Sequence, residues 1–244
     1  SLTHMGIQAP IFDQSPAGFE GPWATTARME TLRSPKELTG PALGLPALTF
    51  RAWFEAQFGP AAWDALDKIP RLQWMDYLRW YRQVLRLDVR NRQRVQAVLP
   101  RADGVVALEM VDESGDTPRS YRVLARHVVL ATGRDGMGGP WVPEWVHDLP
   151  RTHWAHSAHH WRGESLRGKH VAVVGGGASA MDAAATALEN GAARVDLLIR
   201  RRELPRINKG KGAGSPGMAH GFSALPDEWK WRFRHYINVQ QVPP

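Results

Sequence analysis

The sequence predicts an α/β protein that contains a Rossmann-like nucleotide-binding unit. The first observation is the order of segments in residues 170–201, where an apolar strand, a glycine turn, an alanine-rich helix and a second apolar strand follow one another. The second observation is a set of three strand-like stretches, at 94–99, 105–111 and 120–131, which predict a small antiparallel sheet.

The chain before residue 50 predicts one short strand followed by loops. Residues 7–13 have the pattern of a strand that Pro10 interrupts and that ends on Asp13. Residues 14–50 are rich in proline and glycine, which favours irregular backbone. Long loops of this kind are usually functional or covered by a partner.

Helices are predicted next along the chain. Aromatic residues recur at helical steps over residues 50–67, on both sides of Gly59-Pro60. Residues 72–86 predict a more regular helix, whose apolar face is expected to pack in the core and carries Trp74, Tyr77, Leu78, Tyr81 and Leu85.

The three strands of the small sheet follow these helices. Residues 113–116 are expected to form the hairpin turn between the second and third strands. The third strand is expected to continue through an apolar run and to end at residues 131–133, and a last helix is predicted over 225–238.

The glycine turn has the spacing Gly175-x-Gly177-x-x-Ala180, which is typical of dinucleotide binding when alanine takes the third position. Gly175 permits the tight turn, and Gly177 lets the backbone approach a pyrophosphate without a Cβ in the way. Ala180 lets the helix pack close to the strand. The helix start would then present its N–H groups to the phosphates, although a glycine turn without a ligand is the simpler alternative.

Arginines stand where an NAD-binding unit usually has an acidic residue. Arg200, Arg201 and Arg202 follow the second strand, and a guanidinium can bind the 2′-phosphate of NADPH with two hydrogen bonds. The sequence therefore predicts a preference for NADPH over NADH, with a solvated basic strand end as the alternative.

Composition excludes several classes of protein. The 244 residues are 43% hydrophobic and contain no cysteine, which excludes disulfides, thiolate metal sites and a cysteine nucleophile, and which agrees with a cytoplasmic enzyme. No apolar window is long enough for a transmembrane helix, so no membrane association is predicted. The net charge is +7, but the arginines are scattered and not interleaved with aromatic residues, so nucleic acid is not a predicted partner.

The order of these features resembles the flavin-containing monooxygenases, the class B flavoprotein monooxygenases that include Baeyer–Villiger and N-hydroxylating enzymes. The resemblance covers about residues 7–205 and includes a strand ending in Asp13, the Gly-Pro-Trp at 21–23, the Leu-Ala-Thr-Gly at 130–133 and the GxGxxA unit. It implies a two-dinucleotide-binding (Rossmann-like) flavoprotein fold, incomplete at both ends, with a small antiparallel β insertion.

The resemblance also implies a division into domains. Residues 1–150 would be a partial FAD-binding domain that lacks its N-terminal glycine loop, residues 151–167 a linker, and residues 168–244 the N-terminal part of an NADPH-binding domain. The chain is therefore expected to be an internal fragment of a longer protein or a truncated gene product.

The family's cofactor-binding positions can be carried over to this sequence. Asp13 would bind the FAD ribose, Trp23 would lie near the flavin or its pyrophosphate, and the backbone at Val95 would meet the adenine. Thr132 and Gly133 would close on the FAD. The positions implied for NADPH are Gly175, Gly177, Ser179, Ala180, Arg200 and Arg201.

The implied function is that of an FAD- and NADPH-dependent oxidoreductase of the monooxygenase type. NADPH would reduce FAD, and a C4a-(hydro)peroxyflavin would pass one oxygen atom from O₂ to a nitrogen, a sulfur or a carbonyl of a small-molecule substrate. No catalytic side chain is assigned. The main alternative is a non-catalytic NADP(H)-binding module that cannot hold FAD. A flavin or disulfide reductase relative is a further alternative, without the dithiol route because there is no cysteine.

Other kinds of site are less well supported. His153, His156, His159 and His160 have a spacing that could place metal ligands on one helix face, but no acidic residue lies among them and no metal is predicted. Neither a nucleophile elbow nor a P-loop spacing is present.

Overall fold

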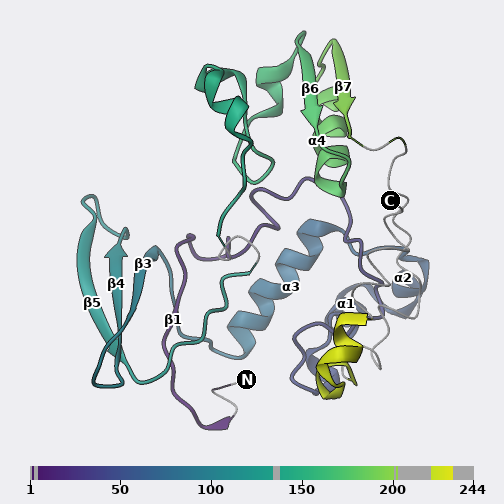
Figure 1. Ribbon diagram of the computed structural model, residues 1–244. Helices are drawn as coiled ribbons and strands as arrows, with labels where there is room; N and C mark the ends of the chain where they lie inside the picture. The colour runs from purple at the N-terminus through teal and green to yellow at the C-terminus, as the bar shows by residue number, and fades with distance from the viewer. Residues whose placement is uncertain (1, 3–4, 134–137, 201, 203–220, 233–244) are drawn as a thin grey trace. The chain divides into compact units, whose positions relative to one another are not determined.

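The computed structural model describes residues 2, 5–133, 138–200, 202 and 221–232 (Figure 1). The chain divides into two compact units, each made of two stretches of sequence. The first unit contains residues 1–27 and 75–158, and the second contains residues 28–74 and 159–244. The glycine turn thus belongs to the same unit as residues 28–50, which are the larger part of the proline- and glycine-rich segment.

The first unit begins with a short parallel strand pair. β1 (Ile11–Phe12) pairs with β2 (Val89–Arg90), and the backbone N–H of Asp13 donates to the carbonyl of Arg90 at 3.0 Å. The strand is shorter than predicted because it begins only after Pro10, which has no N–H to donate to a ladder. It ends at Phe12, one residue before the predicted Asp13.

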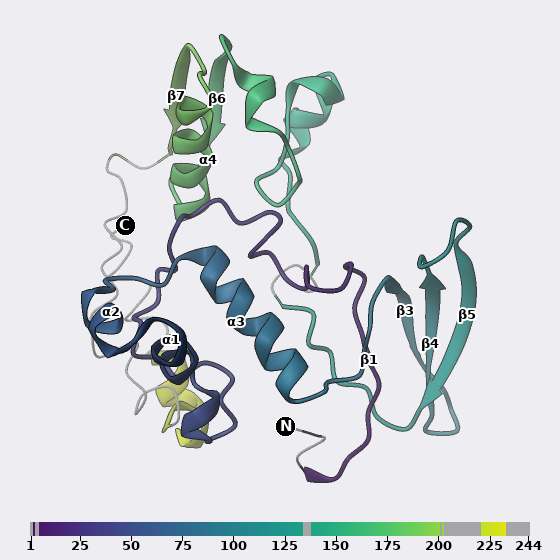
Figure 2. The ribbon, with the colours of Figure 1, turned by 180° about the vertical axis from the view of Figure 1, so that it is seen from behind.

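A three-stranded antiparallel sheet also belongs to the first unit. β3 (Gln93–Pro100), β4 (Val106–Asp112) and β5 (Arg119–Ala125) lie in that order, as Figure 2 shows from behind. The central strand, β4, carries the buried side chains, which are Ala107, Leu108, Met110 and Val111. The predicted small antiparallel sheet is confirmed, but the connection between β4 and β5 is residues 113–118, two residues longer than the predicted turn at 113–116.

The prediction that the third strand continues to residues 131–133 is wrong. β5 ends at Ala125, which pairs with Val106, the first residue of β4, so the ladder has no partner for the residues that follow. Residues 126–132 are irregular, and the side chains of Val129 and Leu130 are 72% and 68% exposed. An apolar run becomes a strand only where a neighbour receives its hydrogen bonds, and none of the described residues does so here.

The regular helix predicted at 72–86 is α3 (Arg71–Val84), which starts in the second unit and continues into the first. Its apolar face is as predicted, with Tyr77 and Tyr81 buried, and Met75 is buried as well. After the helix, the chain reaches β2, and the Arg82 guanidinium donates to the carbonyl of Val89 at 3.0 Å.

The second unit contains an aromatic core under two short helices. α1 (Phe50–Phe58) and α2 (Pro60–Ala65) are separated by Gly59, whose φ of +82° favours glycine, and Pro60 starts the second helix. The Thr49 hydroxyl caps α1 by accepting from the N–H of Ala52 at 3.1 Å. The buried aromatic residues are Phe50, Trp53, Phe54 and Trp63.

The same unit contains the predicted strand, turn, helix and strand. β6 (His170–Val174) and β7 (Arg194–Leu198) are parallel neighbours, and α4 (Ala178–Glu189) connects them (Figure 1). This βαβ arrangement confirms the prediction from the apolar and glycine pattern.

Short 3-10 helices make up the remaining regular structure. They are Pro46–Leu48, Glu144–Asp148, Arg151–His153, Gly163–Leu166 and Phe222–Ala224. Residues 227–232 of the predicted last helix are helical, and residues 233–238 lie outside the described part. None of the helices that the structure describes has the length and apolar content that crossing a bilayer requires.

Candidate nucleotide-binding site

The glycine turn lies where the carboxyl ends of β6 and β7 meet. Gly175 has φ of +133°, and its N–H donates to the carbonyl of Leu198, the last residue of β7, at 2.9 Å. This region of φ is essentially restricted to glycine. The first glycine of the motif therefore has the conformational role that the sequence predicts, and it connects the turn to the second strand.

Gly177 leaves the start of α4 open, and Ala180 packs closely against the glycine turn. Gly177 is the N-cap of α4 and has no side chain to cap that helix start, and among the described residues a Cβ at Gly177 would meet no atom within 4 Å. A Cβ at Gly175 would lie 3.6 Å from the Cβ of Ala180, which shows how closely the helix packs on the turn. The N–H groups of a helix start and its dipole favour an anion, so this turn can accept a pyrophosphate.

The polar residues predicted around this turn are at the surface. Ser179 lies exposed in the first turn of α4, and Arg200 lies exposed two residues beyond Leu198. Arg200 therefore follows the end of β7 by two residues, and the last carbonyl of that strand, on Leu198, accepts from the N–H of Gly175. Arg202 is also exposed, and Arg201 lies outside the described residues.

Two arginines that the sequence did not single out make long-range contacts, one with the βαβ segment and one with the residues that precede it. Arg33 donates through Nη2 to both carboxylate oxygens of Asp182 in α4, at 2.7 and 2.6 Å. The guanidinium of Arg28 lies 4.0 Å from the ring centroid of Trp161 and donates to the carbonyl of His159 at 3.2 Å. Burial lowers the pKa of Arg28, and the negative charge of Asp182 opposes that shift.

No local pattern in the sequence could have revealed these contacts. Arg33 and Asp182 are 149 residues apart, and Arg28 and His159 are 131 residues apart. The only signal was the richness of residues 14–50 in proline and glycine, which predicted a long loop of the kind that is usually functional or covered by a partner.

The first unit brings together two of the residues predicted for FAD. The carbonyl of Asp13 accepts from the N–H of Gln93 at 3.0 Å, and Val95 follows Gln93 by two residues on β3. The Asp13 carboxylate accepts from the N–H of Ser15 at 2.7 Å, which orients it. The register of β3 shifts between Val95 and Ala97, so the ladder is interrupted at the position where the backbone was expected to meet adenine.

The other residues predicted for FAD lie in other segments of the same unit. Trp23 is half-buried in a turn that the N–H of Thr25 closes on the carbonyl of Pro22 at 3.1 Å. Thr132 and Gly133 are exposed and irregular, and Gly133 has φ of +62°. They border residues 134–137, which lie outside the described part.

The histidines at 153–160 do not form a metal centre in the structure. Nδ1 of His156 accepts from the N–H of Ala158 at 3.1 Å, whereas His159 contributes its backbone carbonyl to Arg28. Among the residues that the structure describes, no group of three or more His, Cys, Asp or Glu side chains could hold a metal ion.

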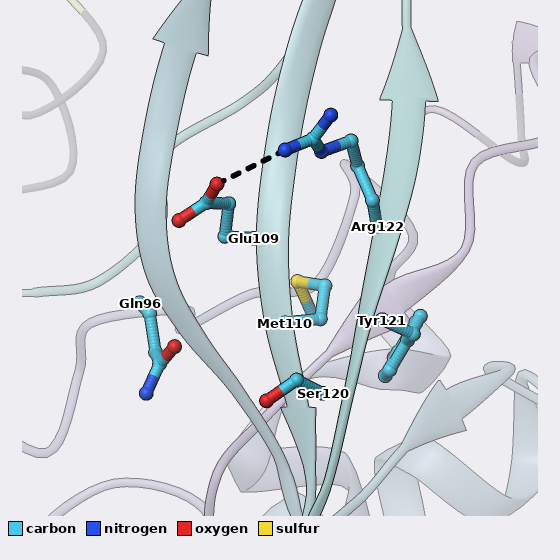
Figure 3. Close-up of a pocket in the computed structure, with 6 residues that line it drawn as sticks. All are labelled: Gln96, Glu109, Met110, Ser120, Tyr121 and Arg122. Atoms are coloured by element: carbon cyan, nitrogen blue, oxygen red, sulfur yellow. Dashed lines mark hydrogen bonds and ion pairs between the residues drawn. The ribbon is translucent and has the colours of Figure 1, made fainter.

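A shallow pocket lies on the antiparallel sheet of the first unit (Figure 3). Its polar side chains include Glu109 and Arg122, which form an ion pair at 3.2 Å, and Gln96, the extra residue where the register of β3 shifts. Because the two charges neutralise each other, this pocket offers no evident charged site. The lining residues are Gln96, Glu109, Met110, Ser120, Tyr121 and Arg122.

A family model and a sequence relative both match this chain over most of its length. The model of the L-lysine 6-monooxygenase/L-ornithine 5-monooxygenase family matches residues 64–233. The chain is 46% identical over 237 residues to an FAD-dependent urate hydroxylase of Xanthomonas campestris pv. campestris, and the match covers 96% of this chain but 48% of that protein.

Solved structures show the same fold. An ornithine hydroxylase of Pseudomonas aeruginosa has a TM-score of 0.72 at 16% identity, over 97% of this chain and 59% of that one. An ornithine N-hydroxylase of Kutzneria sp. 744, solved with reduced FAD, NADP⁺ and L-ornithine, has a TM-score of 0.61 at 18% identity, with coverage of 97% and 59%. The fold prediction is therefore confirmed, and the chain spans only about half the length of these relatives.

Proposed function

We propose that this chain, which belongs to the L-lysine 6-monooxygenase/L-ornithine 5-monooxygenase family, contributes the NADPH site and part of the FAD site of a flavin-dependent monooxygenase. The observation that carries the proposal is the turn between β6 and α4. There, a glycine with φ of +133°, an open N-cap glycine and a helix start without a side-chain cap lie together at the ends of two parallel strands.

These residues suit a pyrophosphate and a 2′-phosphate. The backbone at Gly177 and the N–H groups of the first turn of α4 would hold the pyrophosphate, because a positive helix end and a backbone without a Cβ both favour close approach. Arg200 would bind the 2′-phosphate at the end of β7, and an acidic residue at that position would repel it. Ser179 and Arg201 complete the proposed set.

The proposed FAD site is built in the first unit. The N–H of Ser15 holds one oxygen of the Asp13 carboxylate, so the group is oriented to accept hydrogen bonds from ribose hydroxyls with the other oxygen. The backbone where β3 shifts register, at Val95, would contact the adenine. Trp23, Thr132 and Gly133 are proposed to border the flavin side of the same cofactor.

The chemistry that the bound cofactors supply is hydride transfer from nicotinamide to flavin and activation of O₂ by the reduced flavin. The protein's part is to hold both cofactors in a fixed geometry and to exclude water. Residues 1–150 are proposed to belong to the FAD-binding domain and residues 168–244 to the NADPH-binding domain, with 151–167 as the linker between them.

The substrate proposed for the full-length protein is a small nitrogen-containing molecule. Support comes from the relatives, since one is a urate hydroxylase and two others hydroxylate ornithine. Urate, ornithine and lysine are therefore the first substrates to test, with hydroxylated product measured by mass spectrometry in the presence of FAD, NADPH and O₂.

The first experiment is an absorption spectrum of the chain after incubation with FAD and removal of free cofactor, together with a titration with NADPH. A retained flavin band and saturable NADPH binding are the expected results. NADPH binding without a flavin band would favour the second candidate, an NADP(H)-binding module. This candidate is worth testing because the chain spans only about half the length of the relatives it matches. Absence of NADPH binding would contradict both.

A further inference from the structure

A carboxylate lies in the second turn of α4, the helix whose start would receive the cofactor phosphates. Asp182 follows Ala178, the first residue of α4, by four positions, so it shares a helix face with Ala178 and Ser179. The rise along the axis from Ala178 to Asp182 is about 6 Å. Side chains on a helix tilt toward its N-terminus, which brings the carboxylate still nearer to the glycine turn.

An uncompensated charge at this place would oppose the proposed ligand. A carboxylate and a pyrophosphate have the same sign, and their repulsion at such a distance is considerable near a protein surface, where the effective dielectric constant is far below that of water. The side chain of Asp182 is only 22% exposed, so water screens it incompletely.

Arg33 neutralises this carboxylate from outside the βαβ segment, although both residues belong to the second compact unit. One of its terminal nitrogens, Nη2, donates to both carboxylate oxygens, at 2.7 and 2.6 Å. Hydrogen bonds to both oxygens restrict the direction in which the carboxylate points, although ion pairs near the surface contribute little to the free energy of folding. Arg28 adds a second positive charge in the same segment, and it is fixed by Trp161 and by the carbonyl of His159.

We propose that Arg33 is a positioning residue of the NADPH site, which binds Asp182 so that the carboxylate neither repels the cofactor's phosphates nor turns toward them. This inference depends on the proposed NADPH binding at the glycine turn. NADPH affinity then depends on the loop segment that contains Arg33, because that segment supplies the partner of Asp182 from 149 residues away in the sequence.

The test is a double-mutant cycle on NADPH affinity, measured by calorimetric titration. Arg33→Gln leaves the Asp182 charge uncompensated, and it is expected to weaken NADPH binding by about fivefold to tenfold. Asp182→Asn removes the charge and is expected to leave the affinity within about threefold of wild type. The double variant is expected to bind as Asp182→Asn does.

Arg51→Gln is the matched control. It breaks the ion pair between Arg51 and Glu55 on α1, a helix of the same compact unit that packs chiefly on α2 and on the 3-10 helix Pro46–Leu48, and it should not change NADPH affinity. Thermal unfolding of every variant shows whether it is folded. If Arg33→Gln does not fold, Asp182→Asn and the double variant still test the charge argument.

Three results would overturn the inference. They are wild-type affinity in folded Arg33→Gln, a double variant as weak as Arg33→Gln, or a loss of fivefold or more in Asp182→Asn, which would mean that the carboxylate assists binding. If the wild-type chain does not bind NADPH at all, the proposed function itself fails, so the two failures are distinguishable.

Discussion

Replacing Gly177 with alanine should separate cofactor binding from folding at the glycine turn. Gly177 has φ of −88° and ψ of 175°, which any residue adopts, and an added Cβ would meet no atom within 4 Å. Alanine is a poorer N-cap than glycine by about 0.5–1 kcal/mol. The smaller conformational entropy of the unfolded alanine variant offsets about 0.4–1 kcal/mol of that. The free energy of unfolding should therefore change by less than about 0.5 kcal/mol.

The same methyl group should impair NADPH binding. It would occupy the space that the pyrophosphate needs in order to contact the backbone of the turn. The loss of one hydrogen bond to a charged group costs about 1.5–3 kcal/mol. This corresponds to an increase of about 10- to 150-fold in the dissociation constant of NADPH.

Gly175→Ala is the comparison variant, and it should lose stability. The Cβ would lie at an ordinary contact distance of 3.6 Å from Ala180, but the φ of +133° is strained for any side chain. The expected loss is about 1–3 kcal/mol of unfolding free energy. Urea unfolding followed by tryptophan fluorescence and NADPH calorimetry measure the two effects separately. The reasoning fails if Gly177→Ala is as destabilised as Gly175→Ala, or if it binds NADPH as the wild type does.

Two further predictions test the cofactor preference and the core. Arg200→Glu should weaken NADPH by about tenfold or more relative to NADH, because it replaces a phosphate ligand with a like charge, while Arg194→Glu, at the other end of β7, should affect neither. Equal losses of NADPH and NADH affinity in Arg200→Glu would remove that residue from the 2′-phosphate site. Burial among apolar neighbours, and to a lesser degree Tyr81, raises the pKa of Tyr77 above its ordinary value of 10.0. Below pH 10 both states hold the proton, but above it the unfolded chain releases a proton that the folded chain retains, so stability should fall as the pH rises. In urea unfolding across this range, Tyr77→Phe should show a shallower decline than wild type, and identical slopes would contradict the assignment.

Local patterns in the sequence were sufficient for the nucleotide-binding unit. The apolar strands, the spacing of Gly175, Gly177 and Ala180, and the helix that follows are all determined by steric limits and periodicity within about thirty residues, and each is found as predicted. The aromatic face of α3 and the break at Gly59-Pro60 were predictable for the same reason.

Only the tertiary structure decided how far an apolar run became a strand and which distant residues reached the turn. The run after Ala125 has the composition of a strand, but β4 begins opposite that residue, so no described neighbour receives its hydrogen bonds. Arg33 reaches Asp182 across 149 residues of sequence, and nothing in either local segment indicates the other. The sequence by itself determined the backbone geometry of the glycine turn, because steric limits act between adjacent residues. The charge balance around that turn depended on tertiary structure, because ion pairs form between whichever side chains folding brings together.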